Sequence, residues 1–71
     1  MDYSSLLTNE QKKSILESRI AQFATEAYQH EINLRVAKSL KNDEGVDNAQ
    51  KALVILESAI TEHQAELKSI K

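Results

Sequence analysis

The two histidines of this chain, His30 and His63, are the residues best suited to chemistry, because imidazole can bind a metal ion or transfer a proton near neutral pH. Each has a glutamate about one helical turn away: Glu26 precedes His30, and Glu66 follows His63. Such pairs on two facing helices can form a metal site. Dinuclear carboxylate sites, however, use Glu-x-x-His spacing and further inward-facing glutamates, a pattern that this sequence lacks. We therefore expect no metal or other cofactor, and expect each imidazole to bond a glutamate, a tyrosine or a backbone carbonyl.

His30 and His63 are also the candidates for pH-sensitive groups. Both occupy core positions of the heptad pattern described below, and protonating a buried imidazole below about pH 6 weakens the packing around it. The rest of the sequence contains no nucleophile–base motif and no glycine-rich phosphate loop. Two narrow helices also provide no pocket of the size that substrates need. We therefore predict that the protein is not an enzyme and has no catalytic residue.

Two heptad patterns determine how these side chains are positioned. In each pattern, mainly apolar residues recur at alternating steps of four and three, the spacing at which one side of a helix faces a partner helix. We refer to the two patterns together as the seam, which comprises Leu16, Ile20, Phe23, Ala27, His30, Leu34 and Ala37, followed by Ala49, Leu53, Leu56, Ile60, His63, Leu67 and Ile70. The predicted hairpin core is Ile20, Phe23, Ala27, Leu34, Leu53, Leu56, Ile60 and Leu67.

The seam predicts an all-α fold, an antiparallel two-helix hairpin that resembles a coiled coil and forms one domain over residues 1–71. The first helix is expected over about 8–41 and the second over about 47–69, with a loop at 42–46. Gly45 is the only glycine of a chain without proline, which favours a chain reversal there. A short loop then places the two helices antiparallel.

Capping signals support both predicted helix starts. Thr8 and Gln11 fit a capping box, in which a hydroxyl and an amide satisfy two free backbone N–H groups. Asp47 and Gln50 fit a second one. Two ion pairs at i,i+4 spacing are expected to add modest support: Glu31–Arg35 and Asp47–Lys51.

The first predicted helix is longer than the second, about 50 Å against about 35 Å. With the reversal centred on Gly45, Ile20 lies opposite Ile70, and residues before about Arg19 have no partner in their own chain. This N-terminal overhang is apolar and therefore needs a cover. We expect a second copy or another protein to cover Leu6, Leu7, Ile15 and Leu16.

A second apolar face lies away from the seam. It repeats every four residues on the first helix and broadens the apolar side of the second. One interpretation is a wide core-facing stripe, which is normal in helical bundles. We favour a second interface that assembles two hairpins into a four-helix bundle, formed by Ile32, Val36, Leu40 and Ile55 beside Ala52 and Ala59. Self-association is thus expected, as a dimer or a tetramer.

Composition narrows the remaining functions. The chain has 71 residues, a mass of 8.0 kDa, a net charge of −2 and no cysteine. Small domains without disulfides or metals often gain stability by association. The longest apolar run, residues 52–56, is too short to span a bilayer, and the first residues do not resemble a signal peptide. We therefore expect a soluble cytoplasmic protein.

These observations favour a structural or protein-interaction module, a homo-oligomeric hairpin that scaffolds or binds a partner protein. The alternative is a small regulatory or assembly factor that is ordered mainly when bound to a larger complex. A nucleic-acid or membrane-surface binder would have to use Lys12, Lys13 and Arg19. Because acidic and basic residues are mixed along the chain, we expect neither nucleic acid nor membrane as a partner.

Overall fold

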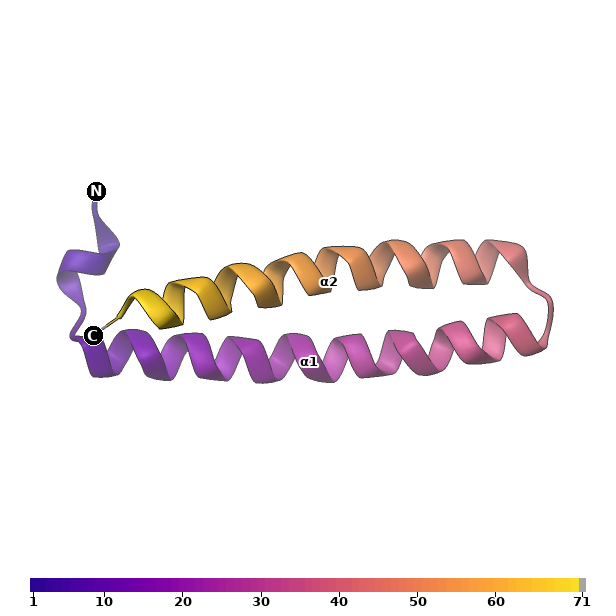
Figure 1. Cartoon of the computed structure of the whole chain (residues 1–71), viewed down its shortest axis with the longest axis horizontal. Coiled ribbons are helices and arrows are strands. Elements are labelled where there is room, and N and C mark those ends of the chain that lie inside the picture. The colour runs from indigo at the N-terminus through magenta and orange to yellow at the C-terminus, as the bar shows by residue number, and fades with distance from the viewer. Residues whose placement is uncertain (71) are drawn as a thin grey trace.

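The computed structural model describes residues 1–70, which form two long antiparallel α-helices preceded by a short 3₁₀ helix (Figure 1). The elements are η1 (Tyr3–Leu6), α1 (Asn9–Ser39) and α2 (Asp43–Ser69). The molecule measures 49 × 20 × 17 Å. We call the end opposite the α1–α2 connection the open end, where η1, the start of α1 and the end of α2 lie (Figure 1). The predicted all-α hairpin is confirmed.

Local capping determines where α1 begins, as predicted. The Thr8 hydroxyl oxygen accepts a hydrogen bond from the Gln11 backbone N–H at 3.1 Å. The Gln11 side-chain oxygen accepts one from the Thr8 N–H at 2.9 Å, which completes the capping box. The preceding turn is capped in a similar way, because the Asp2 carboxylate accepts hydrogen bonds from the Ser4 hydroxyl and N–H. These bonds lower the pKa of Asp2.

Both predicted ion pairs along the helices are present. Arg35 and Glu31 approach to 2.9 Å on α1, and Lys51 and Asp47 approach to 2.9 Å on α2. The hydrogen bond from Lys51 to the Asp47 carboxylate raises the pKa of Lys51. All four side chains are largely exposed, so solvent screens each pair and it stabilises its helix only slightly.

The connection between the helices is shorter than predicted. Because α2 begins at Asp43, the predicted loop at 42–46 and the predicted helix start at Asp47 are wrong. The residue that caps α2 is Asn42, whose side-chain oxygen accepts a hydrogen bond from the Gly45 N–H at 3.1 Å. The predicted second capping box is therefore also wrong, since Asp47 lies inside the helix.

At the chain reversal, Lys41 and not Gly45 adopts the left-handed backbone conformation. Lys41 has a φ of 54°. Its N–H donates to the Lys38 carbonyl at 3.1 Å, and the Asn42 N–H donates to the Ala37 carbonyl at 2.9 Å. Together these bonds form a Schellman motif, which satisfies the last carbonyls of α1 and turns the chain. The motif commonly uses glycine at the left-handed position, which explains why the sequence pattern pointed to Gly45 instead.

Gly45 allows α1 and α2 to pack closely beside their connection. Its φ is not positive, so no left-handed conformation requires a glycine there. A Cβ atom at Gly45 would lie 3.1 Å from the Ala37 Cβ and 2.9 Å from the Asn42 side-chain nitrogen. Ala37 is itself buried, at 8% exposure. The missing side chain of Gly45 therefore allows the first turn of α2 to approach the last turn of α1.

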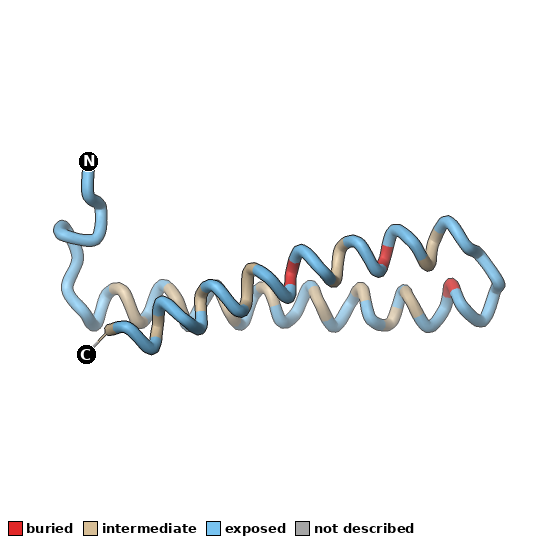
Figure 2. The backbone as a smooth tube through the Cα atoms, turned by 45° about the horizontal axis from the view of Figure 1, so that its top comes forward, coloured by how far each residue is buried: buried red, intermediate tan, exposed pale blue. Residues whose placement is uncertain are grey.

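Every seam residue is buried or half-buried, and these positions recur along both helices (Figure 2). Only three of the described residues are buried: Ala37, Ala49 and Leu56. No side chain of residues 1–70 is fully enclosed. The eight residues of the predicted hairpin core thus lie between the helices, and two helices alone shield them only in part.

Candidate interaction surface

The pairing of the helices at the open end differs from the predicted register. The Arg19 Nε–H donates to His63 Nε2 at 2.9 Å, whereas the sequence placed Ile20 opposite Ile70. Because α2 starts earlier than predicted, its later residues reach further along α1. The expected overhang before Arg19 is therefore wrong in extent, and Leu16 is half-buried as part of the hairpin.

The other three residues of the predicted overhang are not covered by the hairpin. Leu6, Leu7 and Ile15 are exposed, so they remain available to a partner. Below η1, the chain encloses a shallow hollow of about 220 Å³, which is lined by Tyr3, Leu7, Lys12, Ile15, Leu16 and Glu66. The first residues thus fold back beside the open end of the hairpin (Figure 1).

The hollow also establishes which sides of the two helices adjoin. Ile15 directly precedes the seam residue Leu16, Glu66 directly precedes the seam residue Leu67, and both Ile15 and Glu66 line the hollow. In an antiparallel pair, residues that precede seam positions lie on one flank of the hairpin, and residues that follow them lie on the other. Residues before the seam therefore share one flank along the whole molecule.

Toward the connection, this flank is apolar. We call it the apolar flank, and it comprises Val36, Leu40, Ala52, Ile55 and Ala59. The exposed fraction is 51% for Val36, 73% for Leu40 and 69% for Ile55, and the two alanines are half-buried. Ile32, predicted to belong to the same face, is half-buried on α1 one turn before Val36. Of the residues predicted for the second face, Val36, Leu40 and Ile55 thus directly precede seam positions or their continuation, whereas Ile32 lies two residues before the seam residue Leu34.

None of the other residues that directly precede seam positions beside this apolar strip is charged. The other residues that precede seam positions beside it are Gln29, Asn33 and Asn48. Charged residues on the flank begin at Glu26 on α1 and Glu62 on α2, further toward the open end. At the outer edge of the strip, Ile55 lines a surface hollow together with the ion-paired Asp47 and Lys51. A partner that covers the strip therefore desolvates mainly amides and apolar groups and meets one ion pair at this edge.

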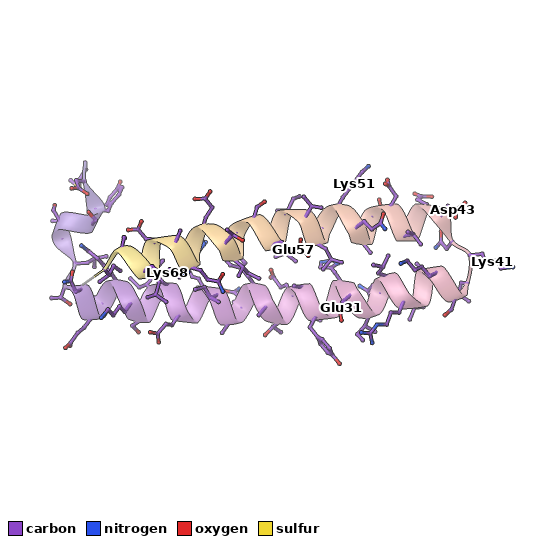
Figure 3. The ribbon with its side chains drawn as sticks, in the orientation of Figure 1. Glu31, Lys41, Asp43, Lys51, Glu57 and Lys68 are labelled. Atoms are coloured by element: carbon purple, nitrogen blue, oxygen red, sulfur yellow. The ribbon has the colours of Figure 1, made fainter. Side chains whose placement is uncertain are left out.

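The opposite flank is polar. Its residues directly follow seam positions and include Glu17, Glu31, Lys38, Gln50, Glu57 and Gln64. Figure 3 labels two of these carboxylates, Glu57 near the middle of α2 and Glu31 on the part of α1 nearer the connection. Tyr28 and Val54 are the exposed large apolar residues of this flank. The two flanks of one hairpin therefore differ in chemistry, and only one of them has the composition of an interface core.

His63 forms the most elaborate side-chain cluster of the hairpin. Its Nδ1 atom lies 2.6 Å from the Ala59 carbonyl oxygen, a backbone partner of the kind expected from the sequence. The ring packs against the edge or face of Phe23 with centroids 5.0 Å apart and an interplanar angle of 75°. The Arg19 guanidinium lies 5.4 Å from the centroid of the same Phe23 ring. Arg19 was not predicted as a partner of His63, because the predicted register between the helices was shifted.

His30 lies apart from this cluster. It is half-buried in the seam, and the part of the chain that the structure describes offers it no hydrogen-bonding partner within reach. Among residues 1–70, no group of three or more histidine, aspartate or glutamate side chains is arranged to hold a metal ion. The two histidines therefore differ in environment, and only His63 makes polar contacts across the helices.

Comparisons of this chain with protein-family models, curated proteins and solved structures found no match. No helix within residues 1–70 combines the length and the apolar character needed to cross a membrane.

Proposed function

We propose that this protein is a non-enzymatic structural module that self-associates, with two hairpins pairing through their apolar flanks to form a four-helix bundle. The cytoplasmic location expected from the sequence belongs to the same proposal. The observation that carries it is the uncharged apolar strip formed by Val36, Leu40, Ala52, Ile55 and Ala59, which the hairpin leaves uncovered.

The accessible surface of the chain supports a second copy as the occupant of this strip. The hairpin exposes 5581 Å², whereas a compact monomer of 8.0 kDa exposes about 4,450 Å². The excess is about 1,100 Å². A stable protein–protein interface buries about 800 Å² on each partner. One additional hairpin laid along the flank would therefore bring the exposed surface per chain close to that of a compact protein.

The thin core supports the same conclusion. Only Ala37, Ala49 and Leu56 are buried among the described residues, and two of these are alanines. A single hydrophobic core in a domain of this size contributes only about 3–5 kcal/mol. The half-buried Ala52 and Ala59 present little bulk, so a partner helix can approach closely beside them. Association would thus bury the exposed Ile55 and complete a core that one hairpin leaves open.

Adjacent residues of α2 provide a matched test. Ile55 and Val54 have similar exposure, 69% and 63%, and border one hollow on the outer side of α2. Ile55 directly precedes a seam position and Val54 directly follows one, so they face the apolar and the polar flank respectively. Sedimentation equilibrium of the unmodified chain should give at least twice 8.0 kDa. Ile55→Glu should lower the mass to that of the monomer with the helical circular dichroism retained, because it places a charge in the interface. Val54→Glu is the control and should keep the mass of the unmodified chain.

Two outcomes would contradict the proposal. The first is a monomer of full helicity at every concentration of the unmodified chain. The second is an equal effect of Ile55→Glu and Val54→Glu on the mass. A monomer that loses helicity on dilution would instead favour the alternative, an assembly factor that is ordered when bound to a larger complex. The exposed Tyr3 and Leu6 of η1, which lie outside the apolar flank, are the residues that such a partner would cover.

A further inference from the structure

The hydrogen bonds of His63 determine its protonation state. Arg19 Nε carries a hydrogen and has no lone pair to offer, so it is the donor, and His63 Nε2 must be the acceptor. The Ala59 carbonyl oxygen can only accept, so His63 Nδ1 must carry the hydrogen. Both contacts are satisfied by one species, the neutral imidazole with its hydrogen on Nδ1. Neither the other neutral tautomer nor the imidazolium can make both bonds.

Protonation of His63 would reverse the sign of the contact with Arg19. An imidazolium has hydrogens on both nitrogens, so Nε2 could no longer accept from Arg19. Two cationic groups would then face each other at hydrogen-bonding distance, which is repulsive. Phe23 would be affected too, because the His63 ring and the Arg19 guanidinium both pack on it. All three residues join α1 to α2 between the middle of the hairpin and its open end.

The geometry points to a proton-operated clasp: Arg19, Phe23 and His63 hold the open end of the hairpin together when His63 is neutral, and protonation of His63 releases it. The clasp acts on the contacts between α1 and α2 within one chain. It is therefore independent of whether two chains pair through the apolar flank. The hollow formed by η1, Ile15 and Glu66 lies at the end that would open.

The other charged groups near the ring are exposed. On α2, Glu62 directly precedes His63, and Glu66 follows it within one turn. On α1, Glu26 lies one turn beyond Phe23. None of these carboxylates bonds the ring, and solvent screens exposed charges strongly. Arg19 is the charged group in direct contact with the ring.

The tautomer can be measured on the unmodified protein. Long-range ¹H–¹⁵N correlation spectra at pH 7.5 should show His63 with its hydrogen on Nδ1 and a bare Nε2. Lowering the pH to 5.0 should shift the Arg19 Nε–H resonance together with the His63 ring signals. Two results would overturn the inference: a hydrogen on Nε2 at pH 7.5, or an Arg19 Nε–H resonance that stays in place while the His63 ring signals shift.

Urea unfolding at pH 7.5 and 5.0 tests the consequence for stability. The unfolding constant of the unmodified chain should rise about fivefold at the lower pH, the size expected for one lost hydrogen bond. His63→Gln keeps an acceptor but does not titrate, so it should remove most of this rise. Arg19→Gln should also reduce it, because it removes the repelling charge. His30→Gln is the control and should keep the full response.

The same urea unfolding experiments are repeated in the Ile55→Glu background at one protein concentration, so that self-association does not contribute to the pH response. If that variant shows the same pH response, the clasp acts within the hairpin. A full response in His63→Gln, or the loss of the response in His30→Gln, would overturn the inference. If His63→Gln does not fold, the tautomer spectrum of the unmodified chain decides the question.

Discussion

Lys41→Gly is the substitution that most directly tests how the two helices are connected. Lys41 has a φ of 54° and occupies the left-handed position of the Schellman motif. Its side chain is exposed, so replacing it removes no packing. The left-handed conformation is unfavourable for any residue with a Cβ atom, and glycine adopts it freely. The substitution should therefore stabilise the protein.

The magnitude follows from two opposing terms. Relief of the left-handed conformation is worth about 1–2 kcal/mol. The greater conformational freedom of glycine in the unfolded chain costs about 0.5–1 kcal/mol. The net gain should be about 0.5–1 kcal/mol, which raises the Tm of a domain of this size by about 5 °C. If the first helix continued through residue 41, as the sequence pattern suggested, glycine would instead cost about 1 kcal/mol and lower the Tm by a similar amount.

Thermal unfolding followed by circular dichroism at 222 nm measures the sign directly. The matched control is Ser39→Gly, which introduces the same residue at the last position of α1. There the backbone is helical, and glycine is about 0.5 kcal/mol worse than serine in a helix, so the Tm should fall by about 3 °C. All proteins should be compared at one concentration, because self-association would shift the Tm. A Tm that falls in both variants would refute the assignment of the reversal to Lys41.

Two further substitutions test the packing between the helices. Leu56→Ala should cost about 2–3 kcal/mol in urea unfolding, the low end for a buried leucine, because the seam is open to solvent on both flanks. Val54→Ala, at 63% exposure, should cost less than about 0.5 kcal/mol, and an equal cost would contradict the seam. Gly45→Ala should destabilise by about 1 kcal/mol despite the better helix propensity of alanine, since its Cβ would lie 3.1 Å from that of Ala37. A Tm that rises in Gly45→Ala would argue against close packing there.

The features that were predictable from sequence are those that depend on residues close together in the chain. The Thr8–Gln11 capping box formed as predicted because its two members are three residues apart and need no partner elsewhere. The Glu31–Arg35 pair formed for the same reason. The seam was predictable because heptad spacing places one set of side chains on one side of a helix whatever the partner is.

The register was not predictable, because it depends on where the chain reverses. The sequence offered Gly45 as the natural position, but a lysine can accept the left-handed conformation when two backbone hydrogen bonds compensate for it. Moving the reversal away from Gly45 shifted every contact between the helices. That shift shortened the expected overhang and brought Arg19 to His63.

The sequence by itself thus determined that this chain forms two helices, which side of each faces the other, and how α1 begins, since helical periodicity and capping act within a few residues. Only the tertiary structure decided which residues meet across the seam. It alone revealed that Gly45 provides space beside Ala37, that Arg19 donates to His63, and that Val36, Leu40 and Ile55 share one flank. These contacts join residues far apart in sequence, and moving the chain reversal from Gly45 to Lys41 changes all of them.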